Sequence, residues 1–345
     1  MSDNKIVKLS SNENCYGCSP LALEAIREKY KEVHLYPEVN PVTLKERLAN
    51  KYGVTVKNIV TGAGSVGIID GLIQTFVGQD QEVLTFEKSF IAYSQLSGFH
   101  KRKCHFAPLS DLRCKPENLF PFINDRTRLI FIANPNNPTG TIISYTELEK
   151  FLAKIPNNII VTIDEAYAEY VTDSSFPNSI ELQRKYPNLV ILHSFSKIYG
   201  LAGLRIGYAI MEENMASKIT QRQIPFSLNY LSSVAAIAAM DDMSFIKESA
   251  KANAEQRGFL ASEIKKLGYN TIPSQANFLY LWFDTDEEKD KAYSILFKNG
   301  IVICDMKIFG QEKSLRITVG EKETNRKIIS LLAKEANVSY VNFSL

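Results

Sequence analysis

Charged and polar side chains follow the apolar runs of this sequence at the points where the runs end. "SFSKIYG" places Lys197 and two serines after "NLVILH", and "TIDEAYAEY" places Asp164 and Tyr167 after "NIIV". A lysine beyond a buried strand is desolvated, which lowers its pKa and frees the amine to attack a carbonyl. A carboxylate in that setting needs a cationic or N–H partner, or its own pKa rises. These residues predict imine chemistry at Lys197, and the plainer interpretation is an ion pair between Lys197 and one of the acids.

Two further runs end in motifs rich in glycine and proline. "GAGSVG", residues 62–67, opens a helix, where free backbone N–H groups and the helix dipole favour an anion such as phosphate. "NPNNPTG", residues 134–140, holds Asn137 between prolines that fix the backbone. Arg205, eight residues after Lys197, could bind a phosphate through two guanidinium nitrogens. Taken singly, the glycines and prolines are explained by tight or rigid turns.

Together these residues describe one cofactor. The set comprises an imine-forming lysine, an acid for a ring nitrogen, a tyrosine and an asparagine for a ring hydroxyl, and a phosphate cup of glycine, serines and arginine. Pyridoxal phosphate requires a Schiff-base lysine and an acidic partner for its pyridinium nitrogen. The sequence therefore predicts pyridoxal 5′-phosphate, with Lys197 as the imine lysine.

The elements that must position these residues alternate between short β-branched runs and longer amphipathic stretches from about residue 55. Runs such as "LIFIA" and "IIVTI" are apolar throughout, as strands covered on both faces must be. The pattern predicts an α/β fold with a mostly parallel, doubly wound sheet. Ligands of such sheets bind beyond the carboxyl ends of the strands, so the motifs should converge there.

The alternation of strand-like and helix-like stretches changes near residue 242, where one long helical stretch runs to Gly268. Strands and helices then follow in an order that suggests a smaller α+β domain. The expected division is an N-terminal arm over residues 1–30 that packs with the small domain, a large pyridoxal-phosphate-binding domain over residues 31–242, and a small C-terminal domain over residues 243–345.

Composition narrows the class of protein. The 345 residues are 45% hydrophobic and 23% charged with a formal net charge of +2, which favours a globular protein and gives no case for nucleic acid or an anionic membrane surface. We see neither a signal-peptide core nor a spanning segment, so a cytoplasmic location is expected. Five cysteines argue against a disulfide framework, and "CYGC" lacks a second ligand pair, so no metal is expected.

The motifs resemble those of fold-type I pyridoxal-phosphate aminotransferases, in the subgroup of histidinol-phosphate aminotransferases. The resemblance runs from "KLSSNENCYGCSP" through "LYPEVN", "GAGSVGII", "NPNNPTG", "DEAYAEY" and "SFSKIYGLAGLRIG" to "SLRITVG". It implies a transaminase that moves an amino group from histidinol phosphate to 2-oxoglutarate, giving imidazole acetol phosphate and glutamate in histidine biosynthesis.

The resemblance also implies roles for individual residues. Lys197 matches the lysine that binds the cofactor and shuttles the proton at the substrate α-carbon, and Asp164 matches the acid on the pyridine nitrogen. Tyr36 matches a tyrosine that reaches the neighbouring subunit's cofactor phosphate, which implies a homodimer with shared sites. The remaining matches are Tyr167 and Asn137 at the ring's 3-oxygen, Phe90 stacked over the ring, Ala63, Gly64, Ser65, Ser194, Ser196 and Arg205 at the phosphate, and Arg316, Asn14, Tyr16 and Asn137 on the substrate side.

Substrate choice stays open at this point. Arg316, in "SLRITVG", matches an arginine that binds a substrate carboxylate or phosphate, whereas Cys304 stands where many histidinol-phosphate enzymes have a second arginine. Losing one charge-assisted contact weakens phosphate binding by about 1.5 to 3 kcal/mol. The alternatives are an aromatic amino acid aminotransferase and a pyridoxal-phosphate lyase or decarboxylase such as threonine-phosphate decarboxylase. A third alternative is the aminotransferase-like half of a transcription regulator. It is disfavoured because the "NEN" segment lies near the start of the sequence and leaves no room before it for a DNA-binding domain.

Overall fold

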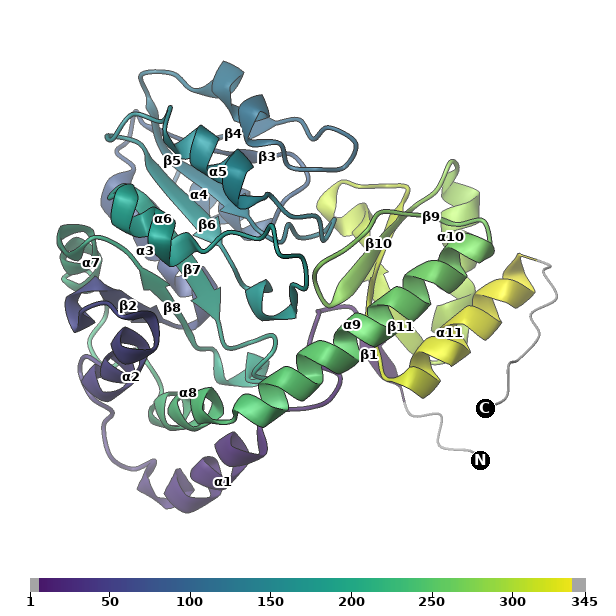
Figure 1. Ribbon diagram of the computed structural model, residues 1–345, viewed down its shortest axis with the longest axis horizontal. Helices are drawn as coiled ribbons and strands as arrows, with labels where there is room; N and C mark the ends of the chain where they lie inside the picture. Colours follow the sequence, from purple (N-terminus) through teal and green to yellow (C-terminus); the bar gives the residue numbers. More distant parts are fainter. Residues whose placement is uncertain (1–5, 337–345) are drawn as a thin grey trace.

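The apolar runs of the first two thirds of the chain form one sheet in the computed structural model, which describes residues 6–336 (Figure 1). Within those residues the sheet has seven strands in the order β2-β8-β7-β6-β5-β3-β4. Strand β8 is antiparallel to both of its neighbours, and the other described pairs are parallel. The strands are β2 (Ile59–Gly62), β3 (Glu82–Phe86), β4 (Lys103–Ala107), β5 (Thr127–Ala133), β6 (Ile160–Asp164), β7 (Leu189–Ser194) and β8 (Gly207–Ile210).

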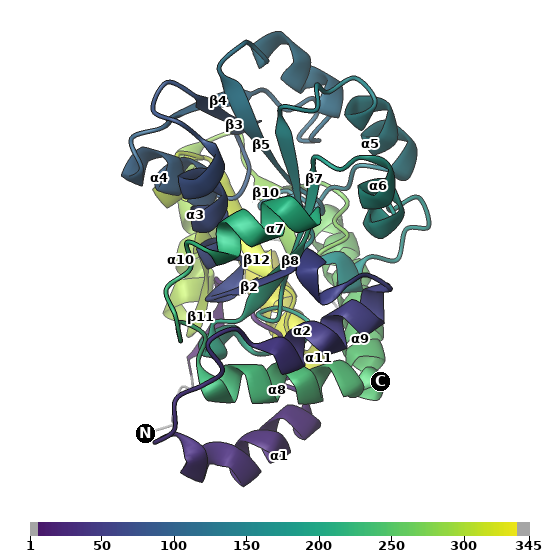
Figure 2. The same cartoon turned by 90° about the vertical axis from the view of Figure 1, so that its left-hand side faces the viewer.

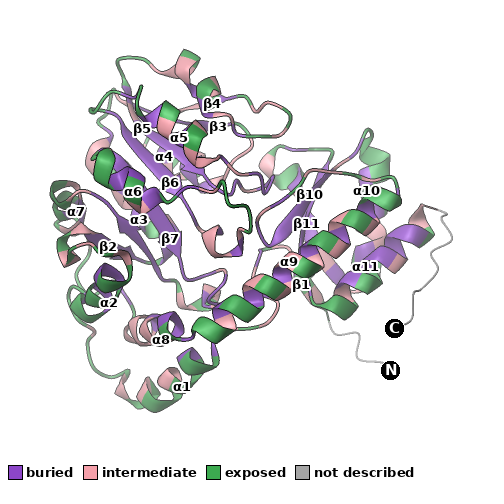
Figure 3. Cartoon of the chain, viewed as in Figure 1, coloured by how far each residue is buried: buried purple, intermediate pink, exposed green. Residues whose placement is uncertain are grey.

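Helices cover both faces of this sheet, which confirms the doubly wound α/β prediction. One face packs against α3 (Gly64–Phe76), α4 (Ala92–Phe99) and α7 (Glu213–Thr220). The opposite face packs against α2 (Val42–Tyr52), α5 (Tyr145–Leu152), α6 (Ser179–Lys185) and α8 (Tyr230–Asp241). The sheet is therefore apolar on both sides, as its uninterrupted runs require, and its strands other than the edge strand β4 are buried along most of their length (Figure 3).

Helix α1 (Pro20–Lys29) lies beside α8 at the edge of the large part, as two views agree (Figure 1 and Figure 2). Ser19 caps α1 by accepting a hydrogen bond from the N–H of Ala22, and Ser19 itself donates to Asp242 at 2.7 Å. Asp242 in turn caps the long helix α9 (Met243–Lys266). Two helix starts are thus joined by one hydrogen bond between capping residues, which stabilises both.

The last third of the chain, together with the first described strand, forms a second sheet. Its order is β1-β11-β12-β10-β9, and β1 pairs in parallel with β11 from Val7 against Ile301. The strands are β1 (Val7–Leu9), β9 (Asn270–Thr271), β10 (Phe278–Trp282), β11 (Ile301–Asp305) and β12 (Ser314–Thr318), and they pack with α9, α10 (Asp286–Lys298) and α11 (Lys322–Glu335). Residues 1–5 of the expected arm and 337–345 of the expected small domain lie outside the described residues.

Short 3-10 helices complete the described chain. They are η1 (Tyr30–Glu32), η2 (Val56–Asn58), η3 (Pro116–Phe122), η4 (Ala168–Tyr170), η5 (Ala202–Leu204) and η6 (Met306–Phe309). Among residues 6–336, no helix combines the length and the apolar character needed to cross a membrane.

The register of the parallel strands brings the predicted site residues to the same level of the large sheet. Asp164, the last residue of β6, pairs with Ala133 at the end of β5 and with Leu192 near the end of β7. The residues that follow these strands therefore meet at one edge of the large sheet. The small sheet lies beyond that edge, with α9 running along both parts (Figure 1).

Candidate active site

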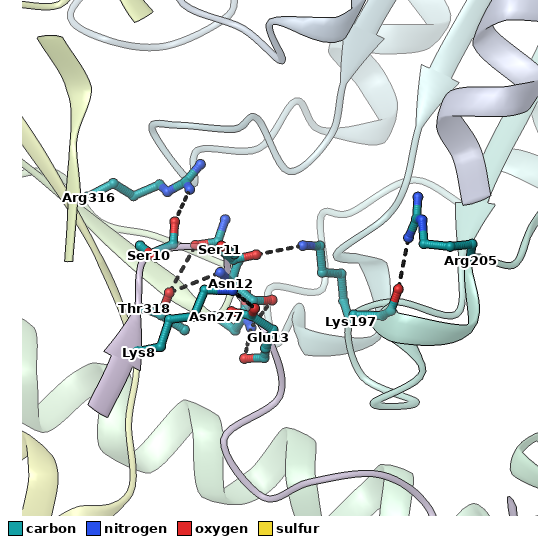
Figure 4. A network of polar contacts seen from close by, with 11 residues as sticks. Lys8, Ser10, Ser11, Asn12, Glu13, Lys197, Arg205, Asn277, Arg316 and Thr318 are labelled. Carbon is teal, nitrogen blue, oxygen red and sulfur yellow. Dashed lines mark hydrogen bonds and ion pairs between the residues drawn. The ribbon is translucent and has the colours of Figure 1, made fainter. Parts of the chain in front are cut away.

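A cavity of about 610 Å³ lies between the carboxyl ends of the large sheet and strands β11 and β12 of the small sheet. Residues 10–13, which follow β1, cross its floor and connect the two halves (Figure 4). Most of the predicted site residues line this cavity: Ser65, Phe90, Asn137, Asp164, Tyr167, Ser194, Ser196, Lys197, Arg205 and Arg316.

Lys197 lies half-buried in the middle of the cavity, three residues beyond the end of β7. Its Nζ donates to the backbone carbonyl of Ser11 at 3.0 Å and lies 5.5 Å from the centre of the Tyr167 ring. No ion pair joins Lys197 to an acid among the described residues, so the plainer interpretation of this lysine is wrong. A primary amine is thus presented to the cavity from a rigid strand end.

Asp164 is buried and is held by two donors. The hydroxyl of Tyr93 donates to Oδ2 at 2.9 Å, and the N–H of Ala166 donates to Oδ1 at 3.1 Å. Burial raises the pKa of Asp164 to about 6, although both donors and the charge of Lys197 act in the opposite direction. A protonated ring nitrogen placed here would complete the carboxylate's set of partners.

Sequence reasoning missed Tyr93. This tyrosine is fully buried, its ring stacks on Phe131 at 4.7 Å, and it meets Phe90 edge to face at 5.6 Å. A tyrosine one helical turn after Phe90, on a helix facing the sheet, reads as core packing. The usable signal is that a buried tyrosine hydroxyl needs a partner.

Arg205 and the serines form a cradle of hydrogen-bond donors. Nη1 of Arg205 donates to Oγ of Ser196 at 3.3 Å, and the N–H of Ser196 donates to Oγ of Ser194 at 3.1 Å. A Cβ on Gly64, whose φ is +71°, would lie 2.4 Å from Nη2 of Arg205. A side chain at position 64 would therefore be strained at this φ and would have to displace the guanidinium. Ala63 and Gly64 shape this turn, and Ser65 reaches the cavity from the first turn of α3.

Tyr167 and Asn137 are both bonded inside the cavity, to partners the sequence did not indicate. Nδ2 of Asn12 donates to Oη of Tyr167 at 3.0 Å, and Nη1 of Arg316 donates to Oδ1 of Asn137 at 2.6 Å. Asn12 is buried and has a left-handed φ of 58°, a conformation that asparagine adopts more readily than most residues.

Arg316 is 8% exposed on β12, and its guanidinium faces the cavity. Nη2 donates to the carbonyl of Ser10 at 2.7 Å, and the guanidinium lies 5.6 Å from the centre of the Phe278 ring. Nε is buried and has no hydrogen-bond partner among the described residues. Cys304 is the residue paired with Arg316 across β11 and β12, so a thiol lies where a second cation could have stood.

Five predicted residues do not line the cavity: Ala63 and Gly64, at the start of α3, and Tyr36, Asn14 and Tyr16. Tyr36 is 85% exposed and packs against Phe226 at 5.0 Å between ring centroids. Asn14 is turned the other way, and its Nδ2 donates to the carbonyl of Ile198 at 2.8 Å. Tyr16 lies beside it, with its N–H bonded to Oδ1 of Asn14. Within this chain, Asn14 supports the backbone after Lys197, and neither Asn14 nor Tyr16 lines the cavity.

The fold and the site define a pyridoxal-phosphate-dependent transaminase of fold type I. The donor set fits that cofactor, because a buried acid, a free lysine amine and a cradle of arginine, serines and glycine lie around one cavity. Residues 4–332 match the model of the family described as aminotransferase class I and II, and the chain belongs to this family.

Similar proteins agree with this class. The chain is 38% identical to histidinol-phosphate aminotransferase 2 of Carboxydothermus hydrogenoformans, over 95% of this chain and 90% of the relative. It is also 38% identical to the histidinol-phosphate aminotransferase of Anaeromyxobacter, over 96% of this chain and 91% of the relative. Its structure resembles that of Sinorhizobium meliloti histidinol-phosphate aminotransferase in complex with pyridoxal-5′-phosphate, with a TM-score of 0.90, 25% identity and coverage of 96% and 92%.

Proposed function

We propose that this chain is a histidinol-phosphate aminotransferase that uses 2-oxoglutarate as the amino acceptor and serves histidine biosynthesis. The observation that carries the proposal is the guanidinium of Arg316, which faces the cavity and whose buried Nε has no hydrogen-bond partner within residues 6–336. Such a nitrogen requires an anionic or polar partner, and the phosphate of histidinol phosphate would supply one. The names of relatives that share 38% of this sequence support this choice of donor.

The cofactor would be held by residues on the large-sheet side. Arg205, Ser194, Ser196 and the Ala63–Gly64–Ser65 turn would bind its phosphate, which is the placement their donors favour. Asp164 would hold the proton on the ring nitrogen, Tyr167 and Asn137 would bond the ring oxygen, and Phe90 would pack against the ring face.

Lys197 would hold the cofactor covalently through Nζ and then move the proton at the substrate α-carbon. Its position beside Asp164 and Tyr167 supports both tasks, because one amine can reach the ring and the reacting carbon. When bound, the cofactor supplies an electron sink for the bond broken at that carbon. Asp164 would keep the ring nitrogen protonated so that the ring can take up those electrons, and this charged hydrogen bond would contribute roughly 1.5 to 3 kcal/mol, one to two decades in rate.

Arg316 would orient the substrate from the small-sheet side. Asn137 bonds Nη1 of this arginine, so it would fix the guanidinium plane as well as contact the ring. Asn14 and Tyr16 would act on the substrate indirectly, through the backbone around Ile198. We also propose that the chain divides into an N-terminal arm over residues 1–30, which packs with the small domain through β1, a large domain over residues 31–242 and a small domain over residues 243–345.

A homodimer would complete the site. Exposed apolar side chains gather on the segment from α1 to the start of α2 and on residues 224–226; we call them the N-terminal apolar patch, and its members are Leu21, Leu23, Tyr30, Val33, Leu35, Tyr36, Val39, Val42, Ile224 and Phe226. Patches of this kind favour burial against another protein surface. A second copy seated there would bring Tyr36 towards its cofactor phosphate, in a cytoplasmic enzyme.

One observation favours a second candidate, an aromatic amino acid aminotransferase. The cavity wall beside Arg316 includes Cys304, its partner across β11 and β12, and the apolar side chains of Ile303, Met306 and Phe309. Such a wall would accept an aromatic ring and offers no second cation to a phosphate.

A single-turnover experiment tests the donor. The holoenzyme is mixed with histidinol phosphate without any keto acid, and the visible absorbance of the bound cofactor is followed; histidinol, phenylalanine and tyrosine serve as comparisons. Rapid loss of the band with histidinol phosphate alone supports the proposal. Loss of the band only with the aromatic amino acids would move the function to the second candidate. Release of carbon dioxide from phenylalanine or tyrosine, the donors that carry a carboxyl group, would indicate a decarboxylase.

Arg316→Met separates the role of the guanidinium from general damage. It should weaken histidinol phosphate by about 10- to 150-fold, since a charge-assisted contact contributes roughly 1.5 to 3 kcal/mol. Histidinol, which has no phosphate, should lose much less. Equal losses for both donors would contradict phosphate binding by Arg316.

A further inference from the structure

A second cluster of ionisable groups lies directly behind the candidate active site. Glu165 follows Asp164, and His193 precedes Ser194, so both point to the face of the sheet opposite to those neighbours. Each is 5% exposed, and Oε2 of Glu165 lies 3.5 Å from Nε2 of His193. The hydroxyl of Ser179, at the start of α6, is hydrogen-bonded to the other carboxyl oxygen. The mechanism proposed above uses neither Glu165 nor His193.

Aromatic rings enclose the imidazole of His193. Tyr52 stacks on one side at 5.6 Å and 22°, Tyr208 stacks at 5.0 Å and 23°, and the two tyrosine hydroxyls meet at 2.5 Å. Nδ1 of His193 is buried with no hydrogen-bond partner among the described residues. An imidazolium carries hydrogen on both ring nitrogens, so protonation would leave a buried, charged N–H without an acceptor.

The surrounding charges disfavour an ion pair from both ends. Lys51 stands near His193 and opposes a positive imidazole, whereas Asp164 and Glu169 stand near Glu165 and oppose a negative carboxylate. Burial is the larger cause in both cases: it raises the pKa of Glu165 to about 8 and lowers the pKa of His193 to about 3. The ionisable groups packed around the pair are Asp164 of β6, Glu169 of η4, Lys51 and Tyr52 of α2, and Tyr208 of β8.

We propose that Glu165 and His193 form an uncharged pair that positions the adjoining ends of β6 and β7. The backbone supports this coupling, because the N–H of Glu165 donates to the carbonyl of Leu192 at 2.7 Å. Through that link the pair fixes Asp164 on one strand and Ser194 on the other, on the opposite face of the sheet. Glu165 and His193 are therefore positioning residues. Their positioning role rests on the proposed roles of Asp164 and Ser194 in the active site, whereas the charge state of the pair does not.

Glu165→Gln tests the charge state by unfolding alone. A carboxamide reproduces an uncharged acid, so the variant should unfold at the same temperature as the wild type at pH 5 and about 2 °C or more higher at pH 8. The sign follows from linkage: the folded pKa of Glu165 is raised, so wild-type stability is complete below the unfolded pKa and is lost as pH rises towards about 8. A variant destabilised at both pH values would establish an ion pair and overturn the proposal.

Cofactor binding tests the positioning role. Glu165→Gln should bind pyridoxal phosphate as the wild type does, whereas Glu165→Leu should raise its dissociation constant about tenfold or more. Ser179→Ala, a milder change at the same carboxyl group, should give a smaller rise in the same direction. Glu149→Gln is the matched control, because Glu149 forms a surface ion pair with Lys185 far from the strand ends.

The two kinds of failure are distinguishable. Unchanged cofactor affinity in folded Glu165→Leu and Ser179→Ala would overturn the positioning role, whatever the unfolding curves show. A wild type that binds the cofactor but ignores histidinol phosphate would contradict the proposed donor and leave both tests of Glu165 interpretable.

Discussion

Gly64→Ala should separate the cost of backbone strain from the cost of moving Arg205. Gly64 has a φ of +71°, and Gly268, at the end of α9, has a φ of +84°. A side chain in the left-handed region costs about 1–2 kcal/mol, so both alanine variants should lose about that much folding stability. A Cβ at position 268 meets nothing within 4 Å, whereas a Cβ at position 64 would lie 2.4 Å from Nη2 of Arg205. Gly268→Ala is therefore the matched control.

The clash at position 64 should appear in cofactor binding. The guanidinium is the far end of a flexible side chain, so it can shift without unfolding the protein, but it then leaves the phosphate cradle. Losing one charge-assisted contact of about 1.5 to 3 kcal/mol corresponds to a rise of about 10- to 150-fold in the dissociation constant for pyridoxal phosphate. Titration of the apoenzyme, followed by the cofactor's visible absorbance, measures that constant. Equal constants for Gly64→Ala and Gly268→Ala would refute the assignment of Arg205 to the phosphate.

Three other changes have expected outcomes. Asp164→Asn should lower the rate by one to two decades. It should also stabilise the apoenzyme by up to about 3 kcal/mol at pH 7, because burial raises the folded pKa of Asp164 to about 6 and the stability of the wild type falls as pH rises towards that value. Denaturant unfolding should show no such gain near pH 3, and a gain that does not change with pH would contradict this reasoning. Lys45→Met should raise the free energy of unfolding by at most about 3 kcal/mol at pH 7, because Lys45 is 3% exposed, its side chain has no partner among the described residues, and burial lowers its pKa to about 8. The gain should shrink between about pH 8 and 10.5, and a loss of stability at pH 7 would contradict the absence of a partner. Cys304→Arg should improve the kcat/KM for histidinol phosphate more than that for phenylalanine, and equal gains would place residue 304 away from the phosphate.

The chemistry of the site could be predicted because it sits at strand ends. Asp164 and Lys197 lie at or beyond the ends of apolar runs, and parallel strands bring such positions to one edge whatever the details of packing. Arg205 precedes β8, and the antiparallel direction of β8 puts its start at the same edge. The structure places all three on the cavity. Their proposed roles remain predictions from the resemblance.

Other features could not be predicted because they depend on contacts distant in sequence. Tyr93 resembles a core residue until its hydroxyl is seen on Asp164, and Asn12 reaches Tyr167 only because β1 joins the small sheet. Asn14 and Tyr16 lie close to Asn12 in sequence but turn away from the cavity. The expected place of Tyr36 is at the cofactor of a second chain, so it stays a prediction from the resemblance.

The segment that follows β1 places two consecutive carbonyl oxygens on two of the basic side chains that line the cavity. Ser10 accepts from Arg316 and Ser11 accepts from Lys197 (Figure 4). A ligand anion that binds Arg316 must therefore compete with a main-chain oxygen. Because one hydrogen-bond partner replaces another, the net binding free energy is smaller than for an arginine that was previously bonded only to water. Because both oxygens belong to one short stretch of backbone, displacing either one loosens the other. Occupation at the small-sheet end would thus change the freedom of the lysine at the large-sheet end, and slower or faster amide exchange at Ser11 and Asn12 would report it.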